Sequence, residues 1–284
     1  MIRFLCLFLL LLCNLDALSL KEPTGELKQP ATTLLELFDI PSTLTPKELV
    51  PYLKAHWLQK GKERWEMEKR CEEKGKAALP LLRALGCINS IHAEKKNYQY
   101  ALVLGAMGKT MQRRLDFLYK EWKRGVRFDQ IVLLTGERDL DPTREKFPEG
   151  LKSETDLFLH LFDRHPLKKI APYTLINSPK QIQKDGSLRR PTTASTMRDW
   201  LRSRPSLGDC LAISTQPFVG YQEAVVRAFL PKGFSVEGVG PGTDNCYPTA
   251  DLDLEVPPVP YPLSIYLDNI AKWLVYEEKM HLLD

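Results

Sequence analysis

Short apolar runs and amphipathic segments alternate along the chain within residues 98–284. Apolar runs of strand length occupy residues 100–104, 130–135, 173–177, 210–215 and 234–239. Segments with the apolar spacing of helices occupy residues 109–124, 152–164, 192–203, 219–230 and 263–282. This alternation predicts an α/β domain, a Rossmann-like three-layer sandwich with a mostly parallel five-stranded sheet covered by helices on both faces.

The part of the chain before this domain follows a different pattern. Residues 20–33 are polar and contain proline and glycine, so we expect a linker. Residues 34–97 predict an α-helical appendage, in which Thr45-Pro46-Lys47-Glu48 is a capping box with proline at the first helical position. The densely charged run at 62–76 is interpreted as a solvated helix face, with a partner-binding surface as the alternative. A more apolar helix follows at 77–91, interrupted near Pro80.

A signal peptide is expected at residues 1–19. The chain begins with a weakly basic Met-Ile-Arg, continues with an apolar run at 4–12, and then has the small residues Ala17 and Ser19 where signal peptidase reads. An apolar run of about nine residues is too short to span a bilayer, which needs about twenty. We therefore expect an exported protein, periplasmic, envelope-associated or secreted, whose mature chain begins near Leu20. Contact with a membrane is expected only through the amino-terminal segment, and an uncleaved anchor is the alternative.

Composition and charge narrow the classes of function. A chain of 284 residues with 43% hydrophobic residues can bury a full core. The net charge of +4 is mild, and basic and acidic residues are mixed, so we expect no nucleic-acid partner. Four cysteines follow the signal, Cys71, Cys87, Cys210 and Cys246, without the spacing of a zinc site. Export permits disulfides, so a Cys71–Cys87 pair and buried free thiols stay open as alternatives.

Polar and basic residues follow the predicted strands. The carboxyl ends of parallel strands meet at one edge of the sheet, where open α/β sheets bind ligands, so these residues are expected to line one crevice. The ligand-binding candidates are Gly105, Gly108, Lys109, Thr110, Arg113, Arg114, Gly136, Arg138, Asp139, Arg190, Thr192, Thr193, Ser214 and Thr215. Arginines and open N–H groups at helix amino termini predict an anionic small molecule that carries a phosphate or a carboxylate. For any single arginine, an exposed position on a helix exterior is the alternative.

Familiar catalytic motifs are absent from the sequence. Gly108-Lys109-Thr110 lacks the glycine five residues earlier that a P-loop needs, and no Gly-x-Ser-x-Gly, His-Glu-x-x-His or Gly-x-Gly-x-x-Gly occurs. No cofactor follows from the sequence. Glu137, at the tip of a predicted strand, and Glu154 are the candidates for a general base. An ion pair of Glu137 with Arg138 or Arg113 is the alternative.

A further pattern runs through residues 98–240. In chain order it consists of Leu104-Gly105, Arg114-Leu115, Gly125, Leu134-Thr135-Gly136, Ser153-Glu154, Arg190-Pro191-Thr192-Thr193, and Ile213-Ser214-Thr215 with Ala224 and Phe229. This order resembles the SanA/YdcF/ElyC family of bacterial envelope proteins, whose core is largely a domain of unknown function. The resemblance implies a Rossmann-like fold, a membrane-attached or periplasmic setting, and a role in envelope integrity or envelope-polymer metabolism.

The resemblance assigns functional residues at six positions and departs from the family elsewhere. The six matching positions are Gly105, Arg114, Gly136, Glu154, Thr193 and Thr215. Thr135-Gly136-Glu137 replaces the family's Ser-Gly-Gly, and residues 214–222 lack its histidine and arginine.

Two functions stay open. One is an exported enzyme acting on a phosphate-bearing or otherwise anionic envelope metabolite. The other is a non-catalytic envelope protein that binds such a ligand or docks a protein partner on its helical appendage. The proline-rich connection at 241–262 is expected to form a lid over the crevice, with a plain surface connection as the alternative.

Overall fold

The computed structural model describes residues 18–59, 62–243 and 261–280. Residues 1–17 of the predicted signal peptide, most of the predicted lid, and Cys246 lie outside the described residues. Within these ranges, no helix combines the length and the apolar character needed to cross a bilayer.

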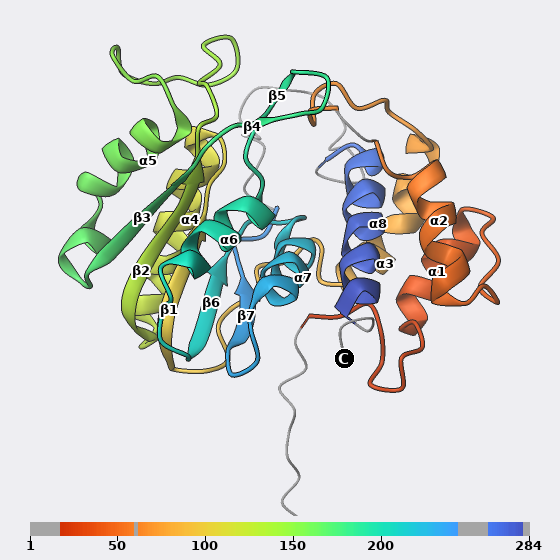
Figure 1. Cartoon of the computed structure of the whole chain (residues 1–284). Coiled ribbons are helices and arrows are strands. Elements are labelled where there is room, and N and C mark those ends of the chain that lie inside the picture. The colour runs from red at the N-terminus through yellow and green to blue at the C-terminus, as the bar shows by residue number, and fades with distance from the viewer. Residues whose placement is uncertain (1–17, 60–61, 244–260, 281–284) are drawn as a thin grey trace, which may run out of the picture.

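A five-stranded sheet with all strands parallel forms the middle layer of the α/β domain (Figure 1). Its strands are β1 (Asn97–Leu104), β2 (Arg127–Gly136), β3 (Tyr173–Ser178), β6 (Asp209–Ile213) and β7 (Ser235–Val239). Their spatial order is β3-β2-β1-β6-β7, so the chain first builds outward from β1 to β3 and then returns to the other side of β1. The predicted α/β fold is confirmed. The reversal makes the carboxyl ends of β1 and β6 the topological switch point, where ligands bind in such sheets.

Helices cover both faces of the sheet (Figure 1). One face carries α4 (Gly108–Lys123) and α5 (Glu154–Asp163), and the other carries α6 (Thr193–Arg202) and α7 (Val219–Phe229). Successive side chains of a strand point to opposite faces of the sheet, so each pair of helices packs on its own hydrophobic cluster. Val103 packs in the cluster of α4 and α5, whereas Leu104 packs in the cluster of α6 and α7.

The amino termini of two of these helices, α5 and α6, are capped by the side chain of the residue that precedes the helix. Ser153 and Thr192 occupy the N-cap positions of α5 and α6, and each accepts the N–H of the third helical residue. The side chains of those third residues, Asp156 and Ser195, return hydrogen bonds to the cap backbone, which completes two capping boxes. Both helices therefore begin close to the carboxyl edge of the sheet.

The helical appendage and the end of the chain share one core. The appendage contains α1 (Gln29–Leu37), α2 (Pro46–His56), the 3-10 turn η1 (Glu72–Lys74) and α3 (Gly75–Ala84). The last helix, α8 (Leu263–Met280), stands between α7 and these helices in Figure 1. Buried residues of α1, α2, α3, α7 and α8 form a single hydrophobic cluster. The appendage is thus anchored to the sheet domain through α8 and α7.

The predicted linker at 20–33 is wrong, because this segment is built into the fold. Leu20 is buried in the cluster shared with α8, Lys21 bridges to Leu27 in an antiparallel turn, and α1 begins at Gln29. The sequence signal was misleading because Pro and Gly here form a tight turn rather than a flexible connection.

The predicted solvated helix across the charged run is wrong over residues 62–71. The side chain of Gln59 exchanges two hydrogen bonds with the backbone of Glu68, at 2.9 and 2.8 Å, and closes a loop. Cys71 then adopts a left-handed backbone with φ of 55°, which ends the loop before η1. The next helix, α3, contains Pro80 without being interrupted by it. The loop is held by local contacts that a periodicity argument does not detect.

Two smaller elements complete the chain. A two-stranded antiparallel hairpin, β4 (Gln181–Ile182) and β5 (Leu188–Arg189), occupies the segment expected as a loop after β3. A 3-10 turn, η2 (Pro166–Lys169), follows α5. The hairpin stands above the carboxyl edge of the sheet, beside the appendage, in Figure 1.

Three cysteines within the described ranges are free thiols. Cys71 is exposed, whereas Cys87 and Cys210 are buried, so the Cys71–Cys87 disulfide is not formed. Burial raises the pKa of Cys87 and of Cys210 to about 12, which keeps both as neutral thiols.

Candidate functional site

The guanidinium of Arg114 lies at the topological switch point. It projects from α4, is fully buried, and donates from Nη1 to the carbonyl oxygens of Leu104 at 2.6 Å and Gly105 at 2.9 Å. Its Nη2 donates to Oε1 of Gln222 at 3.1 Å and reaches Oγ1 of Thr215 at 3.5 Å. Arg114 therefore ties the turn after β1 to the turn after β6 through neutral oxygens.

A buried positive charge without a hydrogen-bonded carboxylate is costly. Burial, followed by the nearby guanidiniums of Arg64 and Arg113, lowers the pKa of Arg114 to about 9. Glu154 and Tyr261 oppose this effect. Nε of Arg114 has no hydrogen-bond partner among the described residues. An anion bound near this edge would stabilise the charged form.

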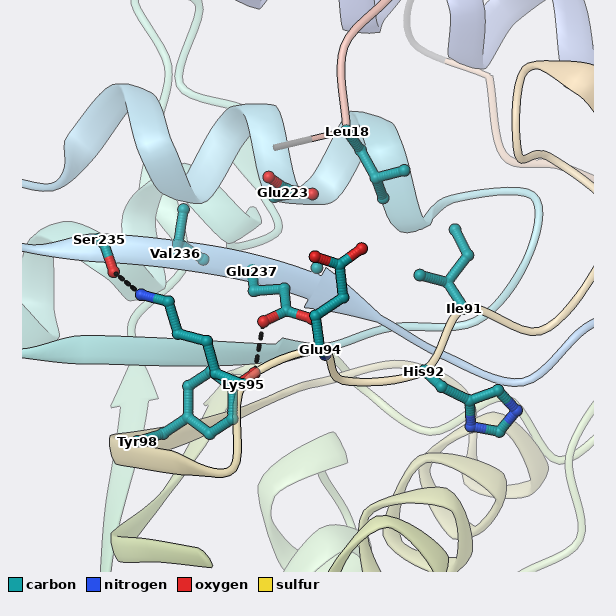
Figure 2. Close-up of a pocket in the computed structure, with 11 residues that line it drawn as sticks. Leu18, Ile91, His92, Glu94, Lys95, Tyr98, Glu223, Ser235, Val236 and Glu237 are labelled. Carbon is teal, nitrogen blue, oxygen red and sulfur yellow. Dashed lines mark hydrogen bonds between the residues drawn. The ribbon is translucent and has the colours of Figure 1, made fainter. Parts of the chain in front are cut away.

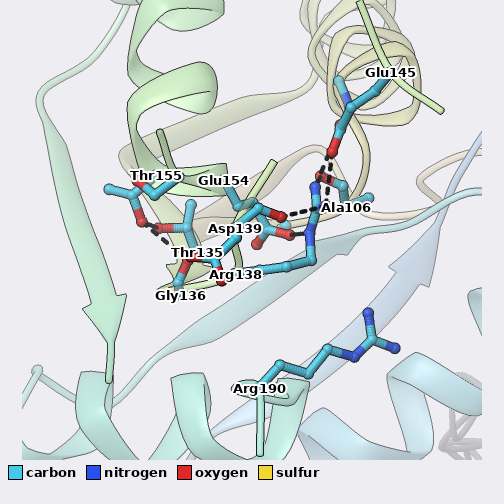
Figure 3. Close-up of polar contacts among 12 residues, drawn as sticks. Ala106, Thr135, Gly136, Arg138, Asp139, Glu145, Glu154, Thr155 and Arg190 are labelled. Atoms are coloured by element: carbon cyan, nitrogen blue, oxygen red, sulfur yellow. Dashed lines mark hydrogen bonds and ion pairs between the residues drawn. The ribbon is translucent and has the colours of Figure 1, made fainter. Parts of the chain in front are cut away.

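Arg138, which is half-buried, forms ion pairs with two buried carboxylates (Figure 3). It follows β2 and pairs with Oε1 of Glu145 at 2.7 Å and with Oε2 of Glu154 at 2.9 Å. Burial opposes its charge, but Glu145 and Glu154 outweigh this and raise the pKa of Arg138. For Glu154 the balance is reversed, because burial raises its pKa above the ordinary value despite Arg138, Arg114 and Arg190. A carboxylate with a raised pKa accepts a proton more readily near neutral pH, as a general base must.

Glycine is required at two positions by close approach rather than by backbone conformation. A Cβ on Gly105 would lie 2.2 Å from Oε1 of Glu154 and 2.9 Å from the carbonyl oxygen of Leu134. A Cβ on Gly136 would lie 2.5 Å from the ring of Pro191. Both predicted glycine turns are therefore parts of the packed edge, and Gly105 makes room for the carboxylate of Glu154.

The amino terminus of α4 already holds a carboxylate. The N–H of Gly108, the first residue of α4, donates to Oε2 of Glu145 at 3.0 Å. Arg138 and this bond hold the pKa of Glu145 below its ordinary value, although burial acts in the opposite direction. The helix terminus expected to meet a ligand anion is thus occupied by a protein anion in this structure.

Four arginines from three separate segments converge above this edge. Arg113 and Arg114 come from α4, Arg190 follows β5, and Arg64 belongs to the charged loop of the appendage. Arg64 and Arg113 act on the charge of Arg114, and Arg190 acts on that of Arg64. The protein atoms around Arg64, followed by the charge of Arg190, lower the pKa of Arg64, although its side chain is exposed.

Specific contacts hold the side chains of three of these arginines. Cζ of Arg64 lies 3.6 Å above the ring centroid of Phe218. Nη2 of Arg113 donates to the carbonyl oxygen of Gly242 at 2.8 Å, and Nε of Arg190 lies 3.1 Å from Oε1 of Glu63. Arg64 and Arg190 still reach solvent. A positively charged surface of this kind, built from guanidiniums, fits a phosphate or a carboxylate in bidentate geometry.

Glu137 and Asp139 lie together at the β3 side of the edge. Glu137 is exposed and accepts the backbone N–H of Lys180 at 3.2 Å, and Asp139 pairs with Nζ of Lys180 at 2.6 Å. The carboxylates that pair with Arg138 are Glu145 and Glu154, so the alternative ion pair of Glu137 with Arg138 is not formed. Of the two predicted bases, Glu154 is therefore the one that lies among the arginines.

The remaining predicted residues serve mainly as local structure. Lys109 is exposed and Thr110 is half-buried on the first turn of α4. Thr192 caps α6, and Thr193 is its first residue. Ser214 is buried and donates to Oε1 of Gln222, so it supports the acceptor that Arg114 uses.

A pocket lies away from the arginines, at the edge strand β7 (Figure 2). It has a volume of about 130 Å³, and three acidic residues, Glu94, Glu223 and Glu237, line it together with Lys95 and the hydroxyl-bearing Tyr98. The hydroxyl of Tyr98 donates to Glu237. This pocket contains none of the predicted ligand-binding residues.

Sequence reasoning missed four residues that complete the site. Glu63 and Arg64 belong to the run interpreted as a solvated helix face, and Glu145 and Gln222 belong to no predicted motif. Their roles depend on contacts between segments that are far apart in the chain. Glu145 lies 37 residues from its partner in α4, and Gln222 lies 108 residues from Arg114. No local pattern could have found these contacts.

Comparison of the chain with protein-family models, with curated proteins and with solved structures finds no match in any of the three. The resemblance to the SanA/YdcF/ElyC family therefore stays a proposal.

Proposed function

We propose that this chain is an exported, envelope-associated α/β protein that binds an anionic, phosphate-bearing small molecule at the carboxyl edge of its sheet. The observation that carries the proposal is the convergence of Arg64, Arg113, Arg114 and Arg190 from three segments. Like charges brought together in a partly desolvated place destabilise one another, and a bound anion relieves that repulsion. The place is also the switch point of the sheet, where ligands bind in open α/β folds.

The proposal includes two versions of the site. In an enzyme, Glu154 would act as the base, since it is the predicted carboxylate that lies among the arginines and has a raised pKa because of burial. In a non-catalytic binding protein, Glu154 and Glu145 would only hold Arg138 in place, as their ion pairs with it support. Docking of a protein partner on the helical appendage is the alternative to ligand binding.

A thermal-shift screen tests ligand binding. Inorganic phosphate, nucleotides, sugar nucleotides and polyprenyl phosphate analogues would be added to the purified protein and to its Arg64→Ala and Arg190→Ala variants. A ligand at about a hundred times its Kd adds about 2.7 kcal/mol of stability. We expect a rise in Tm for a phosphate-bearing compound that both variants reduce. Arg202→Ala is the matched control, because Arg202 is 78% exposed at the last residue of α6.

Turnover separates the two versions. Release of product from the ligand that binds, abolished by Glu154→Gln in a folded protein, supports an enzyme. Binding without turnover supports the non-catalytic version, and a protein that binds none of the compounds leaves the appendage as the functional surface.

A further inference from the structure

The buried carboxylate of Glu277 holds the backbone nitrogen of Leu20. Glu277 lies near the end of α8, is 3% exposed, and its Oε1 accepts the Leu20 N–H at 3.0 Å. Its Oε2 has no hydrogen-bond partner among the described residues. A buried carboxylate with one oxygen left unpartnered is poorly compensated.

The two cations that act on this carboxylate are engaged elsewhere. Lys21 forms an ion pair with Glu278, and Arg227 forms one with Glu223. Burial raises the pKa of Glu277, whereas the Leu20 N–H, Ser19, Arg227 and Lys21 lower it. Among the described residues, the carboxylate therefore has no cation of its own.

Leu20 has contacts of its own besides those that Leu18 and Ser19 make with the cluster, Lys21 and Glu277. Its side chain is 1% exposed in the cluster shared with α8, and its carbonyl oxygen accepts the Lys28 N–H at 2.8 Å. Ala17 and Ser19 are small residues at the positions that signal peptidase reads before a cleavage at Leu20.

We propose that the mature chain begins at Leu20 and that its α-ammonium group forms a buried ion pair with Glu277. This inference rests on the export that is part of the proposed function. Signal peptidase would hydrolyse the Ser19–Leu20 peptide bond: the hydroxyl of water goes to the Ser19 carbonyl carbon, and its hydrogen goes to the Leu20 nitrogen. The new amine is protonated at neutral pH, and its three N–H donors can serve both oxygens of Glu277. Since Leu20 is buried in the folded chain, cleavage precedes folding of this segment.

The first test is the mass and amino-terminal sequence of the full chain after export from a bacterial host. We expect a chain that begins at Leu20; any other start, or an intact signal, overturns the proposal. The α-amine of the native protein should resist modification by 2-pyridinecarboxaldehyde and should react after denaturation. Equal reactivity in the two states would overturn the ion pair even if the start is correct. Neither result depends on ligand binding at the carboxyl edge, so the anion site stands or falls separately.

A substitution of Glu277 gives a second test, because the proposal and its alternative predict opposite changes in Tm. In the exported protein, Glu277→Gln leaves the buried ammonium without a counter-charge, so Tm should fall more than for Glu36→Gln, a control at an exposed glutamate of α1. If Leu20 kept an amide nitrogen, the amide side chain introduced at position 277 would still accept its hydrogen bond. The change would then only remove a buried charge, so Tm would rise or stay unchanged. A rise or no change therefore contradicts the proposal.

Discussion

Nε of Arg190 lies 3.1 Å from Oε1 of Glu63, and this contact joins the segment after β5 to the charged loop of the appendage. The pair spans the carboxyl edge of the sheet from two parts of the chain that the sequence suggested were separate. It places a carboxylate beside one of the four converging arginines. The appendage therefore shapes the proposed anion site as well as packing on α8.

Glu63→Gln should strengthen binding of a phosphate-bearing ligand. The change removes a negative charge beside Arg190, and about 1 kcal/mol for two charges about 4 Å apart in water corresponds to roughly a fivefold gain in affinity. Stability should change by no more than about 1 kcal/mol, because the pair is partly exposed. Calorimetric titration measures the affinity, and weaker binding would contradict the placement of the site.

Arg114→Met should lower the free energy of unfolding by about 1–3 kcal/mol, because the carbonyl oxygens of Leu104 and Gly105 lose their donor and the removal of a poorly compensated charge offsets only part of that cost. Urea unfolding measures this effect. Arg202→Met, on an exposed side chain, should stay within about 0.5 kcal/mol of the parent protein. Equal stability of the two variants would show that Arg114 does not tie the two turns together.

Glu145→Ala should destabilise the protein by about 1–3 kcal/mol, because Gly108 loses its cap and Arg138 loses one of its two carboxylates. Glu149→Ala is the control, on an exposed glutamate of the same loop. The freed helix terminus should also bind inorganic phosphate more tightly than in the parent protein. A variant as stable as the control would contradict the capping role.

Stability should depend on pH through Glu223. Burial raises its pKa to about 7, above the value near 4.3 of an unfolded glutamate. The folded chain therefore binds a proton more tightly than the unfolded chain, and this contribution is complete below about pH 4.3 and is lost as the pH rises through about 7. Urea unfolding at about pH 5 and about pH 7.5 should show a smaller pH-dependent loss in Glu223→Gln than in the parent protein. The same loss in both proteins would contradict the raised pKa.

The sheet was predictable because apolar runs such as Ala101–Leu104 recur with helical segments between them. A strand that is covered on both faces of a parallel sheet needs such a continuous apolar run. The positions of Gly105, Arg114 and Glu154 at the carboxyl edge followed from this topology. The contact of Arg190 with Glu63 did not, because it depends on how the appendage folds back over the sheet.

Local signals also failed where tertiary contacts decide the structure. Leu20 belongs to a proline- and glycine-rich segment that is typical of a linker, yet the hydrophobic cluster around α8 buries it. Glu145 carries no motif, and its role as the cap of α4 arises only when the loop after β2 returns to Gly108.

Calorimetric titration of the phosphate-bearing compound that gives the largest thermal shift tests whether the converging arginines form an anion site. The parent protein, Arg64→Ala, Arg190→Ala and the control Arg202→Ala would be compared. We predict that Arg64→Ala and Arg190→Ala each bind at least about tenfold more weakly than the parent, since a hydrogen bond to a charged group contributes about 1.5–3 kcal/mol. The control should bind like the parent. Equal affinity in all four proteins, or no binding of any compound, would contradict the anion site.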